Sequence, residues 1–317
     1  MNAMLLAAGR GERMEPLSSV VAKPALEVVG EPLCASAARQ LAQLGDPFVV
    51  NLHRHPRQVA AAIREVLPHR RVFFSWEPEL LGGTGGVARA RRLFSPGPLL
   101  VGNGDTVSAL DLAALAAAVE PDCCTLGLVP HPDPARWSSV ELGPDGRVTA
   151  ILPAGAARRS DLFLFTGFQV LGAQVLASLP PPPGEWAPVW RRLRETGRLH
   201  GVVLQGRWQE AGDPRAYRDL VVGSLEASGW RHPLSRVAED VTLDRSAVGR
   251  GCSVGAGCRL TATVVTAGAA VGSRCVLEGC VVAGAFDLPE GTAAREALLL
   301  PTGRFPLPPA RAAGRPG

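Results

Sequence analysis

The chain has 317 residues, nearly half of them hydrophobic and a fifth charged, and this length allows two domains, one of them with a large core. No run of eighteen uncharged apolar residues occurs, so we expect no membrane-spanning helix. The formal net charge is only +4 and the basic residues are scattered, which argues against a nucleic-acid-binding surface. Seven cysteines without a CxxC pair predict buried thiols rather than a disulfide framework or a zinc site.

The N-terminus opens with an apolar stretch, residues 2–8. No basic segment precedes it and no small-residue cleavage pattern follows it, so it predicts a first β-strand rather than a signal peptide. We therefore expect a cytoplasmic protein.

Strands and helices alternate over the first 130 residues. Further strands are predicted at the apolar runs 47–52, 71–76, 98–103 and 123–129. Helices are predicted between them at 31–44, from Pro56 onward, at 84–94, and from the capping residue Asp111 through Val119. This order predicts an α/β fold in which helices cover both faces of a mainly parallel sheet.

The pattern changes after residue 130. A Gly-Pro-Asp-Gly turn at 143–146 lies between two strand-like runs and predicts a hairpin. A strand at 162–170 and helices near 188–197 and 214–227 complete a first domain over residues 1–228.

Residues 229–300 show no helical period. From about Val241, an aliphatic residue recurs at every sixth position, as in Val248, Val254 and Leu260, and the register slips by one before Val271. Such hexads predict a short left-handed parallel β-helix of about three coils, with a bulged turn at the slip. Its apolar face and open ends need covering, so we expect it to serve domain docking or homo-oligomer assembly rather than catalysis. The tail 301–317, rich in Pro, Arg, Gly and Ala, is predicted to be disordered.

The chain has 33 basic residues, and only one of them, Lys23, is a lysine. An ammonium is a compact point charge, whereas a guanidinium is a planar fork. A sequence so biased towards arginine indicates a special role for the ammonium at this position.

A glycine-bearing loop, Gly9-Arg10-Gly11, follows the first strand and lets backbone N–H groups approach a phosphate closely. The dinucleotide fingerprint GxGxxG fails because its last position holds Met14, and the second strand ends without an acidic residue for a ribose. A Walker loop is also excluded, because no GK[ST] occurs.

The segments GRGERMEPLS (9–18) and AKPAL (22–26) resemble GxGTRLxPLT and PKPL, the N-terminal signature of the nucleotidyltransferases that activate sugar 1-phosphates. Glu12, Met14 and Ala22 depart from that signature. The resemblance implies a Rossmann-like domain of the nucleotide-diphospho-sugar transferase type. It also implies that the nucleotide is bound by Leu6, Ala8, Gly9, Gly11 and Arg13, and that Lys23 contacts the phosphates in transfer.

Four further segments are similar to the same family in the same order. Leu80–Gly86 resembles the LGTxG loop and implies nucleotide contacts from Gly83, Thr84 and Gly85. Residues 102–105, GNGD, resemble the NGD whose aspartate binds Mg²⁺, here Asp105. FTGF (165–168) resembles a strand of the sugar pocket and implies that Gly167 lines it.

The fourth segment, WQEAGDP (208–214), resembles WxDxGTP, whose aspartate is the second metal ligand. By alignment the ligand is Glu210, while Asp213 stands where threonine is usual, so either carboxylate is a candidate.

These residue types suit the joining of two polyanions, because phosphoryl transfer depends mostly on positioning and charge neutralisation. One or two carboxylates with phosphate oxygens suit Mg²⁺. The resemblance thus implies catalysis by Arg13, Lys23 and Asp105, a nucleoside triphosphate and a sugar 1-phosphate as substrates, and an NDP-sugar and pyrophosphate as products.

One departure bears on the sugar. The Glu-Lys pair by which many members hold the sugar phosphate is missing, and Arg158 or Arg159 either replaces it or is a solvated loop residue. Guanylyl- and muramate-type members also lack this pair, which makes a mannose-1-phosphate guanylyltransferase-like enzyme the closest match.

Two other functions compete with this interpretation. Acyl transfer by the β-helix is disfavoured because all six histidines lie at or before His232. A catalytically silent regulatory homologue would have lost activity through the changes in the glycine-rich segment or at Glu210.

Overall fold

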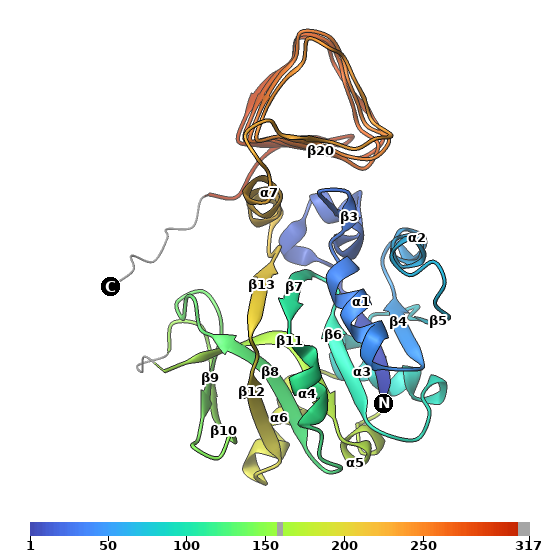
Figure 1. Ribbon diagram of the computed structural model, residues 1–317, viewed down its shortest axis with the longest axis vertical. Coiled ribbons are helices and arrows are strands. Elements are labelled where there is room, and N and C mark those ends of the chain that lie inside the picture. The colour runs from blue at the N-terminus through green and yellow to red at the C-terminus, as the bar shows by residue number, and fades with distance from the viewer. Residues whose placement is uncertain (157–160, 310–317) are drawn as a thin grey trace.

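The computed structural model describes residues 1–156 and 161–309 (Figure 1). A nine-stranded sheet forms the centre of the larger domain in the order β10-β9-β11-β6-β1-β4-β5, with β8 beside β11 and β12 beside β8. Its strands are β1 (Asn2–Leu6), β4 (Phe48–Leu52), β5 (Val72–Trp76), β6 (Leu99–Asn103), β8 (Cys124–Pro130), β9 (Ser139–Leu142), β10 (Val148–Leu152), β11 (Phe163–Leu171) and β12 (Leu199–Val203). Strands β1, β4, β5 and β6 are parallel, whereas β11 is antiparallel to both β6 and β8. The predicted mainly parallel sheet is confirmed.

Helices cover both faces of this sheet because successive strand residues point to opposite sides. Ala3 and Leu5 of β1 pack in one core with α1, α2 and α4, while Met4 between them packs in a second core with α3, α5 and α6. The helices are α1 (Ala35–Leu44), α2 (Pro56–Val66), α3 (Gly82–Ala90), α4 (Leu112–Ala117), α5 (Ala173–Ala177), α6 (Trp186–Glu195) and α7 (Pro214–Gly223). As predicted, Asp111 caps α4, its side chain accepting hydrogen bonds from the N–H groups of Ala113 and Ala114.

The first helix begins later than predicted. Glu31–Pro32 form strand β3, which pairs with β2 (Glu27–Val28) across a tight turn. Val29 and Gly30 both have positive φ in that turn, which is the geometry of the two-residue hairpin, and the helix begins only at Ala35. Short 3-10 turns lie at Glu12–Met14, Leu17–Ser19, Lys23–Ala25 and Arg91–Leu93.

A separate antiparallel ribbon is formed by the two strands that follow β6 and β12 in the chain. It pairs β7 (Thr106–Leu110) with β13 (Gly206–Glu210), and the sequence pattern did not predict it. The ribbon joins the strand end after β6 to the start of α7.

The C-terminal domain is a left-handed parallel β-helix of three stacked sheets. One sheet contains β14 (Trp230–Arg231), β17 (Ala247–Val248), β20 (Val264–Thr266), β23 (Val281–Ala283) and β26 (Ala297–Leu300). The second contains β15 (Arg236–Val237), β18 (Ser253–Val254), β21 (Ala270–Val271) and β24 (Asp287–Leu288), and the third β16 (Thr242–Asp244), β19 (Arg259–Thr261), β22 (Val276–Glu278) and β25 (Ala293–Arg295).

The β-helix is longer than the predicted three coils, since four strands stack in each of the second and third sheets. Its first coil starts at Trp230, where bulky and charged residues hide the hexad pattern. Equivalent residues of successive coils are 17 apart, as with Ser246 and Thr263. Three complete hexads would need about 18 residues, so one corner of each coil is a residue short. The predicted slip is that corner, which is one residue short rather than bulged as predicted, and Ala262 there has a φ of 46°.

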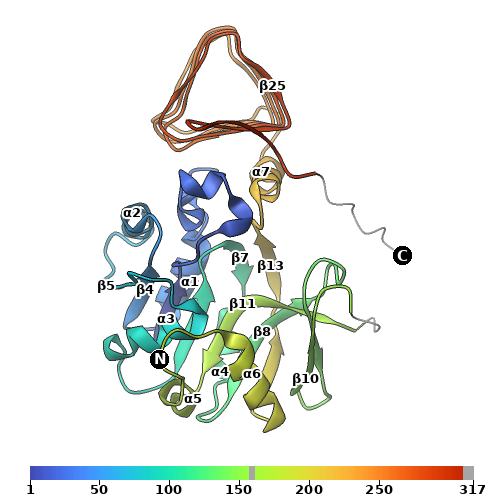
Figure 2. The ribbon, with the colours of Figure 1, turned by 180° about the vertical axis from the view of Figure 1, so that it is seen from behind.

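The β-helix docks on the segment that follows β1. Figures 1 and 2 show α7 and the N-terminal loop beneath the β-helix. Met14, Leu17 and Val21 share a buried cluster with outward-facing residues of the first β-helix sheet, among them Val264 and Val281. The β-helix therefore packs against the larger domain, and its expected roles in docking and in homo-oligomer assembly stay predictions.

Polar contacts reinforce the same interface. Within the larger domain, the hydroxyl of the fully buried Tyr217 on α7 donates to the Glu27 carbonyl at 2.6 Å and holds this helix in place. Across the interface, Arg218 of α7 reaches Glu296 of the β-helix at 2.8 Å, and Arg250 of the β-helix reaches Glu65 on α2 at 2.7 Å. Ion pairs from α7 and α2 thus connect the two domains.

The tail differs from its prediction. Gly303–Pro306 form strand β27, which pairs antiparallel with β26, because the chain reverses at residues 301–302 and finds an open sheet edge. Residues 310–317 lie outside the described part of the chain. Within residues 1–156 and 161–309, no helix combines the length and apolar character needed to cross a membrane.

Candidate active site

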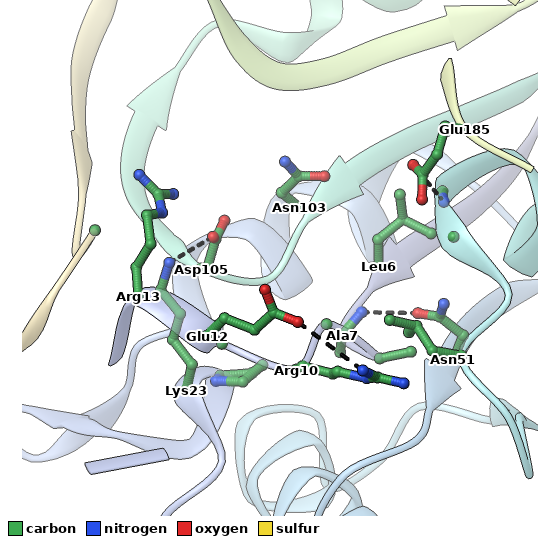
Figure 3. Close-up of a pocket in the computed structure, with 18 residues that line it drawn as sticks. Leu6, Ala7, Arg10, Glu12, Arg13, Lys23, Asn51, Asn103, Asp105 and Glu185 are labelled. Carbon is green, nitrogen blue, oxygen red and sulfur yellow. Dashed lines mark hydrogen bonds and ion pairs between the residues drawn. The ribbon is translucent and has the colours of Figure 1, made fainter. Parts of the chain in front are cut away.

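A cleft of about 490 Å³ opens where β1, β4 and β6 reach their carboxyl ends, which is where open α/β sheets bind ligands. Figure 3 shows its lining, to which β1, the loop after it, the ends of β4 and β6, the start of α3 and the residue before α6 all contribute. The cleft thus collects segments from across the larger domain.

A cluster of opposite charges lies at one end of the cleft. Lys23 Nζ lies 2.6 Å from Asp105 Oδ2 and 3.7 Å from Glu210 Oε1. Arg13 Nη2 lies 2.6 Å from the same Glu210 oxygen. The Lys23 side chain is only 9% exposed, so its ammonium is held between the two carboxylates rather than in solvent.

The ribbon of β7 and β13 explains why two carboxylates far apart in the sequence meet. Asp105 stands between β6 and β7, and Glu210 ends β13 in register with Thr106. Gly104 N donates to the Leu6 carbonyl at 2.9 Å and so holds the turn that carries Asp105 against β1. The second oxygen of Glu210 accepts a hydrogen bond from Trp137 Nε1 at 3.3 Å.

Asp213 has a different environment. It is buried before α7, where its side chain accepts from the N–H of Ala216 at 2.9 Å and caps that helix. Asp213 and Glu210 both line a second cavity beside this cleft, and Glu210 Oε1 reaches to 3.7 Å from Lys23 Nζ.

A buried hydrogen-bond chain fixes the start of the loop after β1 relative to the segment before α3. Asn51 Oδ1 accepts from Ala7 N at 2.7 Å, and Asn51 Nδ2 donates to Glu77 Oε1 at 2.7 Å. The other Glu77 oxygen accepts from Leu81 N at 3.1 Å. A Cβ on Gly86 would lie 2.7 Å from Glu77 Oε1, so a glycine is required at that position.

Sequence reasoning missed the role of Asn51 and Glu77. The available signal was an acidic residue, Glu77, directly after a strand and close to an unusually glycine-rich segment.

Most residues predicted to bind the nucleotide line the cleft, namely Leu6, Ala8, Gly9, Gly11, Arg13 and Gly83. Thr84 and Gly85 do not line it. Both are buried in the first turn of α3, where their N–H groups donate to the Gly184 carbonyl at 3.1 Å.

Of the three residues predicted to bind the sugar phosphate, Gly167 belongs to the described part of the chain. Gly167 has a φ of 88° and packs against the Asn103 side chain at the end of β6. Arg158 and Arg159 lie outside the described residues.

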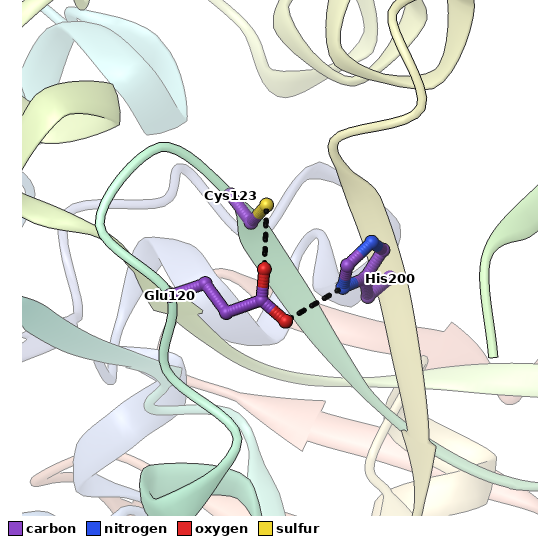
Figure 4. A group of neighbouring side chains, drawn as sticks. All are labelled: Glu120, Cys123 and His200. Atoms are coloured by element: carbon purple, nitrogen blue, oxygen red, sulfur yellow. Dashed lines mark hydrogen bonds and ion pairs between the residues drawn. The ribbon is translucent and has the colours of Figure 1, made fainter. Parts of the chain in front are cut away.

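A second group of polar residues lies away from the cleft, at the start of β8 and β12 (Figure 4). Cys123 Sγ donates to Glu120 Oε2 at 3.4 Å, and His200 Nδ1 lies 3.7 Å from Glu120 Oε1. Burial, followed by the neighbouring carboxylates of Glu120 and Asp122, raises the pKa of the Cys123 thiol to about 12. The thiol is therefore a protonated donor at neutral pH. All seven cysteines are buried and free, as predicted.

The fold and this cleft define an α/β protein with a charged cleft at the carboxyl edge of its sheet. Residues 2–221 match the family model described as nucleotidyl transferase, and the chain belongs to that family. The matched residues all lie within the larger domain.

Individual relatives agree with the family. The chain is 31% identical over 231 residues to N-acetylmuramate alpha-1-phosphate uridylyltransferase of Caulobacter vibrioides, which covers 68% of this chain and 93% of that protein. It is 26% identical over 301 residues to mannose-1-phosphate guanylyltransferase of Mycobacterium tuberculosis, covering 88% of this chain and 83% of that protein. The crystal structure of HddC from Yersinia pseudotuberculosis shares the fold, with a TM-score of 0.59 at 21% identity over 69% of this chain and 97% of that one.

Proposed function

We propose that the protein transfers a nucleotidyl group from a nucleoside triphosphate to a sugar 1-phosphate, forming an NDP-sugar and pyrophosphate. The observation that carries this proposal is the convergence of Asp105 and Glu210 on the ammonium of Lys23, at the phosphate end of a cleft bounded by a glycine loop. The names of the relatives, which act on sugar 1-phosphates, support the substrate class.

The carboxylates fit a divalent cation. Asp105 and Glu210 both reach the point occupied by Lys23 Nζ, and hard carboxylate oxygens with phosphate oxygens suit Mg²⁺. We propose these two residues as the metal ligands and Asp213 as the cap of α7. When bound, Mg²⁺ would neutralise charge on the phosphates.

The residues of the chain would supply the rest of the mechanism. The glycine loop and Gly83 bind the nucleotide, and Arg13 and Lys23 neutralise the phosphates and hold them in place. A phosphate oxygen of the sugar 1-phosphate attacks the α-phosphorus, and the bond to the bridging oxygen of the pyrophosphate group breaks in line. The attacking oxygen is already ionised at neutral pH, so no general base is needed.

For the particular substrates we propose GTP with a mannose-type hexose 1-phosphate, in a cytoplasmic setting. The alignments with mannose-1-phosphate guanylyltransferases support this choice, because they extend into the β-helix and cover 80–88% of this chain, whereas those with the uridylyltransferases cover 67–68%.

The test is pyrophosphate release with Mg²⁺ across GTP, UTP, ATP, CTP and dTTP, each paired with a set of sugar 1-phosphates. We expect release only when both substrates are present, and highest with GTP and mannose 1-phosphate. A wild-type protein that releases none with any pair would be the silent homologue, and the proposal would fail.

A further inference from the structure

A third cation approaches the site from a loop that no sequence motif marks. Residues 131–138 connect β8 to β9 and carry Arg136 to the edge of the cleft. The position of a Cβ on Gly212 would lie 3.6 Å from both Arg136 Nη2 and Arg13 Nη1, and 3.7 Å from Glu210 Oε1. The guanidinium of Arg136 therefore stands beside the charged cluster formed by Lys23 and the two carboxylates.

Arg136 is held in place without being neutralised. Its guanidinium carbon lies 4.1 Å from the centroid of the Trp137 ring, a cation–π contact. Its Nε is buried and has no hydrogen-bond partner, and no carboxylate among residues 1–156 and 161–309 forms an ion pair with it. A buried donor without a partner is costly, so the arrangement favours an anionic ligand that satisfies it.

The second cavity, of about 430 Å³, is lined by Arg136 and Glu210, and Gly212, which lines the first cleft, lies close to both of these side chains. Two indole rings line the second cavity, those of Trp137 and Trp208, with centroids 6.5 Å apart and planes at 73°. Both rings are fixed by hydrogen bonds, from Trp137 Nε1 to Glu210 at 3.3 Å and from Trp208 Nε1 to the Thr166 carbonyl at 2.8 Å. A rigid apolar wall beside a cation suits a sugar ring that carries a phosphate.

We propose that Arg136 binds the phosphate of the sugar 1-phosphate, with Trp137 and Trp208 facing the sugar ring. This assignment rests on the proposed function. Lys23 and Arg13 are balanced by Asp105 and Glu210, so Arg136 supplies the additional positive charge that an incoming dianion needs. Its fork can bind two phosphate oxygens at once, which a lysine cannot do in the same way.

The test compares Arg136→Gln with Arg136→Lys and with Arg207→Gln, a control on an exposed arginine of β13 that lies outside both cavities. Initial rates of pyrophosphate release are measured with each substrate varied in turn. We expect Arg136→Gln to raise KM for the sugar 1-phosphate about tenfold to a hundredfold, while KM for the nucleotide stays within about twofold. Arg136→Lys should be intermediate, and the control should match the wild type.

An unchanged KM for the sugar 1-phosphate, or an equal rise in both KM values, would overturn the assignment. The melting temperatures of all three variants show whether a loss is one of folding. If Arg136→Gln does not fold, the same comparison of the two KM values in Arg136→Lys decides.

Failure of the proposed function can be told apart from failure of this assignment. If the wild type releases no pyrophosphate with any pair, titration calorimetry measures the binding of α-D-mannose 1-phosphate to the wild type and to Arg136→Gln. Binding by the wild type that is lost in the variant upholds Arg136 as the phosphate ligand. Equal binding, or none by the wild type, overturns it.

Discussion

Lys23 Nζ lies 2.6 Å from Asp105 Oδ2. This ion pair joins the loop after β1 to the turn after β6. Because Glu210 also approaches the ammonium, Lys23 is held between two carboxylates. A divalent ion bound by these carboxylates would compete with Lys23 for them and release the ammonium towards the phosphates.

Lys23→Arg should lose most activity although the charge is kept. The fork of arginine does not fit a nearly enclosed site shaped for a point donor, and losing one preorganised donor typically lowers kcat by on the order of a hundredfold. Steady-state rates check this, with Arg39→Lys, a change in the surface pair with Glu31, as the control. Near-normal turnover would show that retention of the lone lysine is incidental.

Asp105→Asn should abolish Mg²⁺-dependent turnover and change the melting temperature little, since this carboxylate lies in the cleft and outside the core. Asp111→Ala is the opposite case. It removes the cap of α4, so it should cost about 1 kcal/mol of stability and leave specific activity intact. Stability loss with preserved specific activity in Asp105→Asn would mean that Asp105 is structural.

Glu210→Gln should cut turnover strongly with Mg²⁺ or Mn²⁺, whereas Asp213→Asn should be tolerated because asparagine caps a helix as well as aspartate does. Glu210→Asp should shift the preference between the two metals several-fold, because Mg²⁺ tolerates less distortion of its octahedral shell. Rates of all three variants with both metals test this. The reverse pattern would make Asp213 the ligand.

Val281→Asp should impair both folding and activity through the domain interface. Val281 is fully buried on the outer face of the β-helix, in the cluster that includes Met14 and Leu17 of the loop between Arg13 and Lys23. An unpaired charge there should cost about 3–5 kcal/mol. Val276→Asp, at a half-exposed position on another face, is the matched control. Melting curves and activity measured well below melting check it, and equal behaviour of the two variants would contradict the docking role.

The sequence predicted the sheet of the larger domain well because its strands are recognisable from their runs of apolar residues. Strand residues such as Ala3, Met4 and Leu5 are all apolar, as expected for a sheet covered on both faces. The family resemblance predicted that Lys23 and Asp105 belong to one site, and both line the same cleft, while their catalytic roles stay a prediction.

The features that sequence reasoning missed depend on tertiary contacts. The β7–β13 ribbon decides where Glu210 points, and no local pattern encodes that pairing. In the first β-helix coil the hexad position equivalent to Val248 is Arg231, and this charged residue interrupts the aliphatic pattern before Val237. Arg136 lies in an irregular loop, and only the fold brings it beside Arg13.

The most direct test of the central claim follows the α-phosphate itself. [α-³²P]GTP with mannose 1-phosphate, and [α-³²P]UTP with N-acetylmuramate 1-phosphate, are incubated with the wild-type protein and Mg²⁺, with Asp105→Asn in parallel. We expect the label to appear in an NDP-sugar together with an equal amount of pyrophosphate, and neither product with the variant. Label that stays in the triphosphate, or appears only as free nucleotide, with these and all other pairs of nucleotide and sugar 1-phosphate would contradict the claim.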